Sequence, residues 1–125
     1  MSGSDEEILR FIAASFPSVW TLELLLALKR EQRTWQREEL VATLRASELV
    51  VSNALDALVA AGLASIEGEG AVYVPVSSSV GNCVERAEQL YRTRSNEVRR
   101  TIVSAGKSSA VAFANAFKIR RERDD

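Results

Sequence analysis

The stretch SELVVSNALDALVAAGLASIEGEGAVYVPV, residues 47–76, predicts a helix followed by a β-hairpin. Ser47 is a favourable N-cap, and Gly62 followed by Leu63 is typical of a Schellman stop. Between these signals, apolar residues recur at helical spacing, at Val51, Ala54, Leu55 and Leu58. Two strands are expected at about 63–67 and 71–75, joined by Gly68-Glu69-Gly70. The stretch contains no Lys or Arg at all.

The residues before this stretch predict three further helices. Ser4-Asp5-Glu6-Glu7 is a capping-box pattern and predicts a helix over about 4–15. The run SVWTLELLLALKREQ, which begins at Ser18, is apolar on most faces and is expected to form the central helix of the core, with Trp20 as a core anchor. A third helix begins at Thr34 or Gln36, and Trp35 is expected to pack at the edge of the core.

The residues after the hairpin predict a helical extension. Apolar stripes follow the serine-rich joint at 77–79, over 80–91, 98–102 and 110–117. These stripes pack either on the N-terminal helix of the same chain or on a second copy, and a two-fold homodimer is the favoured hypothesis. The candidate interface residues are Val84, Leu90, Tyr91, Val98, Ile102, Phe113 and Phe117.

The order helix, helix, helix, hairpin indicates a mainly α (α+β) fold, a winged helix-turn-helix with a short two-stranded antiparallel wing. The residues WQREELVATLRASELVVSNALDALVAAGLASIEGEGAVYVPV, 35–76, resemble bacterial transcriptional regulators of the MarR-like type, with Ala61-Gly62-Leu63 as the step into the wing. The expected division is an N-terminal helix at 1–16, the winged helix-turn-helix domain at 17–76, and the helical C-terminal extension at 77–125.

The resemblance implies that the helix at 47–61 reads DNA in the major groove. It assigns the base-facing positions to Ser47, Glu48, Ser52, Asn53 and Asp56. The chain departs from the family pattern in the wing, where Glu67 and Glu69 stand in place of basic residues. Because affinity for DNA depends on phosphate neutralisation, cations outside this stretch must supply it. Five candidates flank the end of the central helix and the helix before the turn: Lys29, Arg30, Arg33, Arg37 and Arg45. The other candidate source is the basic tail, with Lys118, Arg120, Arg121 and Arg123.

Two functions follow from this charge pattern. The leading expectation is a dimeric DNA-binding transcriptional regulator that grips phosphates with basic residues outside an acidic recognition helix. The alternative is a winged-helix adaptor that binds a protein partner through the acidic wing face and does not bind DNA. The formal net charge of the chain is −1, whereas residues 46–79 carry four acidic side chains and no basic ones.

The composition also narrows the chemistry. The chain has one cysteine, Cys83, and no histidine, which excludes an internal disulfide, a multi-cysteine zinc site and any Ser-His or Cys-His pair. We therefore expect no enzymatic activity, no metal and no cofactor. The N-terminus is acidic where a signal peptide is basic, and no apolar run approaches the length of a membrane span. These features predict a soluble cytoplasmic protein.

Overall fold

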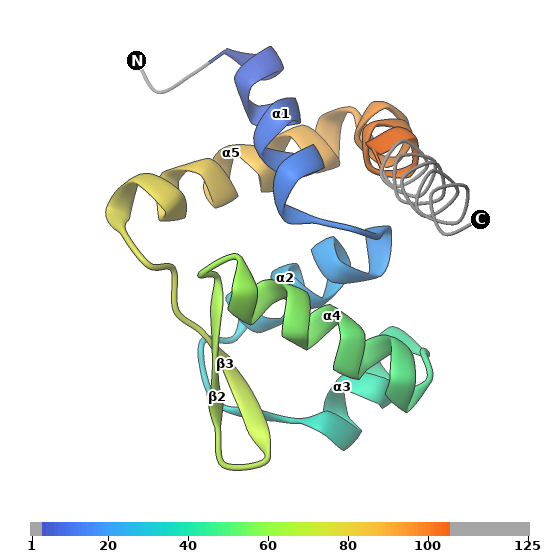
Figure 1. Ribbon diagram of the computed structural model, residues 1–125, viewed down its shortest axis with the longest axis vertical. Helices are drawn as coiled ribbons and strands as arrows, with labels where there is room; N and C mark the ends of the chain where they lie inside the picture. The colour runs from blue at the N-terminus through green and yellow to red at the C-terminus, as the bar shows by residue number, and fades with distance from the viewer. Residues whose placement is uncertain (1–3, 106–125) are drawn as a thin grey trace, which may run out of the picture.

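The computed structural model describes residues 4–105, which form a mainly helical α+β fold with a small antiparallel sheet (Figure 1). The elements are α1 (Asp5–Ser15), α2 (Val19–Arg30), β1 (Trp35–Gln36), α3 (Arg37–Leu44), α4 (Glu48–Ala60), β2 (Ala64–Glu67), β3 (Gly70–Tyr73), α5 (Ser78–Thr93) and a helix over 95–105. No single helix among these residues is long and apolar enough to cross a membrane, although α1 and α2 together, bent by 103°, have that length and composition.

Helix α2 is the centre of the core, as predicted. In Figure 1, α1 and α5 lie above it, while α3, α4 and the sheet lie below it. Its N-cap, Ser18, accepts a hydrogen bond from the backbone N–H of Thr21, which is itself buried. The prediction for Trp20 is wrong, because this side chain is 42% exposed. Trp20 shares a side of α2 with the buried Leu24 and Ala27, but it lies in the first turn of the helix.

The sheet has three strands rather than the expected two, in the order β1-β3-β2. The additional strand, β1, is only two residues long and pairs Trp35 with Ala71 and Gln36 with Gly70. Glycine is required at position 70 of this strand pair, since an added Cβ would lie 2.5 Å from the backbone oxygen of Trp35. Trp35 was expected at the edge of the core, but it is buried among the core residues, and its indole Nε1–H donates to the Glu31 carbonyl oxygen at 2.9 Å.

The ends of α4 follow the sequence signals. Ser47 accepts from the backbone N–H of Val50 at 3.1 Å, which satisfies one of the free donors of the first turn. At the other end, Gly62 adopts a φ of 75°, and the Leu63 N–H donates to the Leu58 carbonyl oxygen at 2.9 Å. This is the predicted Schellman stop, and it directs the chain from α4 into the hairpin.

Helix α5 and the helix over 95–105 pack back onto the same chain. Helix α1 lies against α5, and Asp5 forms ion pairs with Arg86 and Arg94. Four of the predicted dimer-interface residues are buried in the core of the single chain and are therefore not available to a second copy: Val84, Leu90, Val98 and Ile102. Of the two alternatives, packing within the same chain is the one that these four side chains adopt. Phe113, Phe117 and the expected last helix lie outside the described residues.

Candidate functional site

The exposed side of α4 carries the residues that the resemblance assigned to base reading. Ser47, Glu48, Asn53 and Asp56 are exposed, and Ser52 is half-buried. Leu49 belongs to the same side, because it lies three and four residues before Ser52 and Asn53. It is 69% exposed, whereas the opposite side of α4 is buried. The sequence reasoning missed Leu49, although its helical spacing from those two polar residues was a sufficient signal.

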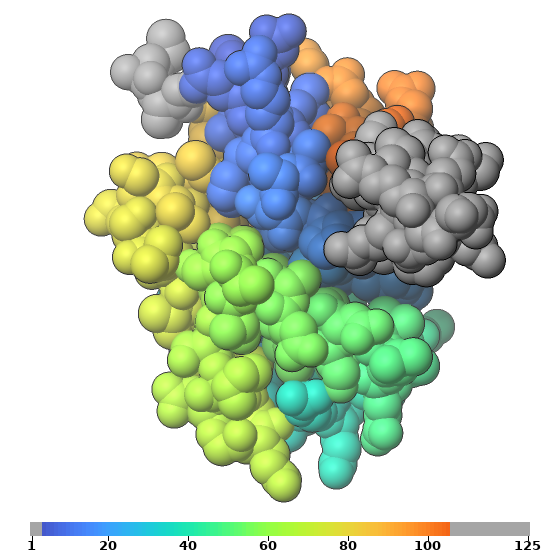
Figure 2. Space-filling model, in the orientation of Figure 1, coloured from blue at the N-terminus to red at the C-terminus, as the bar shows by residue number. Residues whose placement is uncertain are grey.

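An open groove lies between the start of α3, the start of α4 and the tip of the hairpin. Its volume is about 440 Å³, and it is lined by Gln36, Arg37, Glu38, Glu48, Gly68 and Glu69. Figure 2 shows the hairpin and the start of α3 protruding next to each other at the bottom of the molecule, with a hollow between them. The lining thus combines three carboxylates with one guanidinium, so the groove is acidic.

A second hollow extends this groove along α4. It measures about 190 Å³ and is lined by Arg37, Val41, Glu48, Val51 and Ser52. Because Arg37 and Glu48 line both hollows, the two adjoin each other on α3, α4 and the hairpin tip. We call the combined lining, together with Leu49, the α4 face.

Lys29, one of the five phosphate candidates, is held inside the fold. Its Nζ lies 2.8 Å from Glu88 and 3.0 Å from Glu85, and its side chain is only 13% exposed. Burial lowers the pKa of Lys29, but the hydrogen bonds and charges of Glu88 and Glu85 outweigh burial and raise it above its ordinary value of 10.5. Lys29 therefore joins α2 to α5 and is not free to reach a phosphate.

Arg33 also forms ion pairs, although its side chain is more exposed than that of Lys29. Its guanidinium makes a two-point contact with the Glu39 carboxylate, at 2.9 and 3.1 Å, and an ion pair with Glu31 at 3.4 Å. It also stacks 4.1 Å from the centre of the Trp35 ring. Hydrogen bonds from Arg33 and from the Gln36 backbone N–H lower the pKa of Glu39 below its ordinary value. The charge of Arg33 is thus offset by two neighbouring carboxylates.

The remaining three candidates, Arg30, Arg37 and Arg45, are exposed. Arg37 donates from Nη1 to the Ser52 hydroxyl at 2.6 Å, which fixes the start of α3 against α4. Arg45 ends α3 in the left-handed conformation, with a φ of 55°. Within residues 4–105, none of these three guanidinium groups forms an ion pair.

Comparison with known proteins adds no assignment to this geometry. No protein-family model matches the chain, and neither the curated proteins nor the solved structures contain a significant match. The resemblance to MarR-like regulators therefore stays a prediction from the residues at 35–76.

Proposed function

We propose that residues 17–76 form a winged helix-turn-helix domain. The order α2, β1, α3, α4, β2, β3 supports this proposal, as does the pairing of β1 with the hairpin strand β3. In this arrangement α4 is the recognition helix, the connection at 45–47 is the turn, and the hairpin is the wing.

We further propose that this domain is a protein-interaction module whose α4 face binds a cationic segment of a partner protein. The observation that carries the proposal is the charge of the groove, where Glu38, Glu48 and Glu69 face one arginine. A DNA backbone meeting this face would bring its phosphates against three carboxylates, which opposes binding. A lysine- or arginine-rich segment would instead find complementary charge.

The apolar content of the α4 face also favours a protein partner. Leu49 is 69% exposed and follows Glu48, which lines the groove. Protein interfaces combine an apolar centre with a polar rim, and truncating a buried central anchor weakens them most. Leu49 would supply the anchor, and the glutamates of the groove would supply the rim.

DNA binding is the second candidate function, and one observation favours it. Arg30, Arg37 and Arg45 are exposed at the ends of α2 and α3, and no ion pair within the described residues occupies them. In a winged helix, the helix before the turn crosses the DNA backbone, so these three residues would be the phosphate contacts. A DNA-binding regulator built this way would have to overcome the acidic groove between them.

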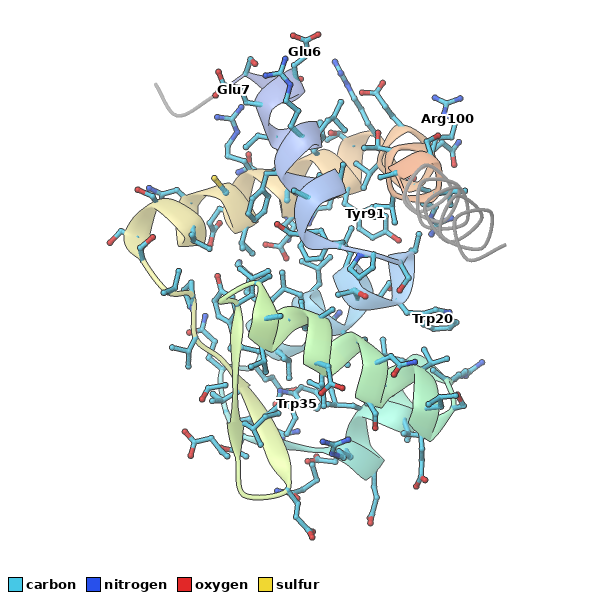
Figure 3. All side chains as sticks on the ribbon, in the orientation of Figure 1. Glu6, Glu7, Trp20, Trp35, Tyr91 and Arg100 are labelled. Carbon is cyan, nitrogen blue, oxygen red and sulfur yellow. The ribbon has the colours of Figure 1, made fainter. Side chains whose placement is uncertain are left out.

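A pair of binding titrations over the same salt series distinguishes the two functions. The probes are a labelled short peptide rich in arginine and leucine, and a labelled mixed-sequence DNA duplex. The informative variant is the double substitution Glu48→Gln with Glu69→Gln. Its matched control is Glu6→Gln with Glu7→Gln, which removes the same charge from the far end of the molecule (Figure 3).

For an interaction module, we expect the peptide to bind and the duplex not to bind, even at low salt. The groove variant should lose about tenfold in peptide affinity, while the control changes little, because electrostatic complementarity acts within about 10 Å at moderate salt. Leu49→Ser should weaken the peptide without altering the salt slope. Duplex binding that falls steeply with salt, and that the groove variant strengthens, would instead establish the DNA-binding function.

A further inference from the structure

The sheet has one edge that the described part of the chain leaves unpaired. In the strand order β1-β3-β2 of residues 4–105, β2 lies at the edge and pairs with β3 alone. The hairpin that carries this edge forms the lower end of the molecule in Figure 1. The free edge of a strand presents backbone N–H and C=O groups that can pair with a further strand.

The hydrogen bonding of the hairpin identifies which groups of β2 face this free edge. The Val74 N–H donates to the Leu63 carbonyl oxygen at 3.1 Å, so Leu63 faces β3. Residues along an antiparallel strand alternate between facing their partner strand and facing away from it. Ser65 therefore also faces β3, whereas Ala64 and Ile66 direct their N–H and C=O groups to the free edge. Ala64 is buried, so the accessible groups are those of Ile66, which is 42% exposed.

The side chains around Ile66 determine what kind of strand this edge accepts. Ile66 itself offers an apolar contact on the side of the sheet that carries the buried Ala71, its partner on β3. Glu67 follows it on β2 and Glu69 lies in the turn; both are exposed, and neither forms an ion pair within residues 4–105. An added strand therefore meets uncompensated negative charge, and a strand with basic side chains complements that charge.

The same charges disfavour a second copy of this chain as the added strand. Its β2 edge would bring another Glu67 and another Glu69, and residues 46–79 contain no basic side chain to offset them. Charged side chains at an edge commonly prevent such self-pairing. We propose instead that an extended, cationic segment of a partner protein adds to β2 as a fourth strand of the sheet. This inference rests on the proposed function, because Gly68 and Glu69 follow β2 directly and line the acidic groove, so that one segment can occupy both.

Amide hydrogen exchange in the full chain tests this pairing, with the arginine- and leucine-rich peptide as the probe. At saturating peptide, we expect exchange of the Ile66 amide to slow by at least about tenfold, because its N–H acquires an acceptor. The Ser65 amide is the internal control, since it already faces β3 and should change little. Two further peptides carry N-methyl groups at either the odd or the even positions. One should keep its affinity and the other lose it, because only one edge of an added strand faces β2.

Ile66→Pro and Ile66→Ala form a matched pair of variants for the same titration. Both shorten the apolar side chain, but only proline removes the N–H at the free edge, and neither removes a hydrogen bond to β3. We expect the proline variant to bind the peptide about tenfold more weakly than the alanine variant, as for the loss of one hydrogen bond. Equal affinities of the two variants would contradict pairing at Ile66.

Several results would overturn the proposal. An Ile66 amide that stays unprotected while the peptide is bound would exclude the added strand and leave the proposed function intact, and this measurement needs no substitution. Equal loss of affinity for both methylated peptides would indicate a helical ligand, and equal retention would indicate binding through side chains alone. Protection of Ile66 that appears without peptide and disappears on dilution would assign the edge to a second copy. Absence of any peptide binding would refute the proposed function, and this inference with it.

Discussion

Lys29→Met tests whether Lys29 is a structural residue rather than a ligand for phosphate. Methionine keeps the unbranched apolar stem of lysine but removes the charge that contacts Glu88 and Glu85. Exposed ion pairs contribute about 0.2–1 kcal/mol, whereas removing one partner of a buried pair costs about 3–5 kcal/mol. The Lys29 and Glu88 side chains are 13% and 19% exposed, so we expect a loss of about 1–2 kcal/mol, between those limits.

The assay is urea unfolding of a double-mutant cycle that combines Lys29→Met with Glu88→Gln. We expect a coupling free energy of about 1 kcal/mol between the two sites. Arg30→Met is the matched control, because Arg30 is exposed on the next position of α2 and should change stability by less than about 0.5 kcal/mol. Strict additivity in the cycle, or an equal loss in the control, would refute the structural role of the ion pair.

The same pair makes a prediction about pH. The pKa of Lys29 in the folded chain lies above 10.5, its ordinary value, so the protonated form stabilises the fold. This contribution is fully present below pH 10.5 and is lost as the pH rises through the folded pKa. The stability difference between the unsubstituted chain and Lys29→Met should therefore be constant from neutral pH to mildly alkaline pH, and should shrink only above pH 10.5. A difference that shrinks in acid would point to another group.

Three further predictions concern the sheet, α5 and the start of α3. Gly70→Ala should lower stability by about 1–3 kcal/mol in urea unfolding, because the added Cβ would lie 2.5 Å from the Trp35 backbone oxygen. An unchanged unfolding midpoint would contradict the close pairing of β1 with β3. Gly81→Ala should instead raise stability by about 0.5–1 kcal/mol, since Gly81 lies within α5 and the nearest atom to the added Cβ is 3.6 Å away. Hydrogen bonds from Arg33 lower the pKa of Glu39, so the ionised carboxylate stabilises the fold above pH 4.5, and this stabilisation is lost in more acidic solution. Glu39→Gln should therefore flatten the acid dependence of the melting temperature in thermal unfolding. An unaltered pH profile would show that the Arg33–Glu39 contact does not stabilise the fold.

Much of the fold could be predicted because its signals are local. Ser4, Ser18 and Ser47 each accept a backbone N–H of the first helical turn, and this chemistry needs only neighbouring residues. The left-handed Gly62 is local in the same sense. Strand β1 was missed because two residues carry no periodic pattern, and its pairing partner, β3, lies more than thirty residues further along the chain.

In the candidate site, too, the local features could be predicted from the sequence and the long-range contacts could not. The polar positions of α4 were predictable, since helical spacing determines which residues share its exposed side. The partners of Arg33 are its sequence neighbours Glu31 and Glu39, but the partner of Lys29 was not predictable, because it lies on a distant helix. Lys29 binds Glu88, 59 residues away in the sequence, so it is a link between helices. Only three of the five cations expected to contact phosphate remain outside ion pairs in the described part of the chain.

By itself, the sequence determined the helices of the described residues, the hairpin and the acidic composition of residues 46–79, because propensity, capping and charge are properties of short segments. Only the tertiary structure decided that α1 covers α5, that Lys29 forms ion pairs with Glu85 and Glu88, and that Trp20 is exposed while Val84 is buried. Burial and ion pairing depend on which distant elements meet, and packing of the whole chain sets those encounters.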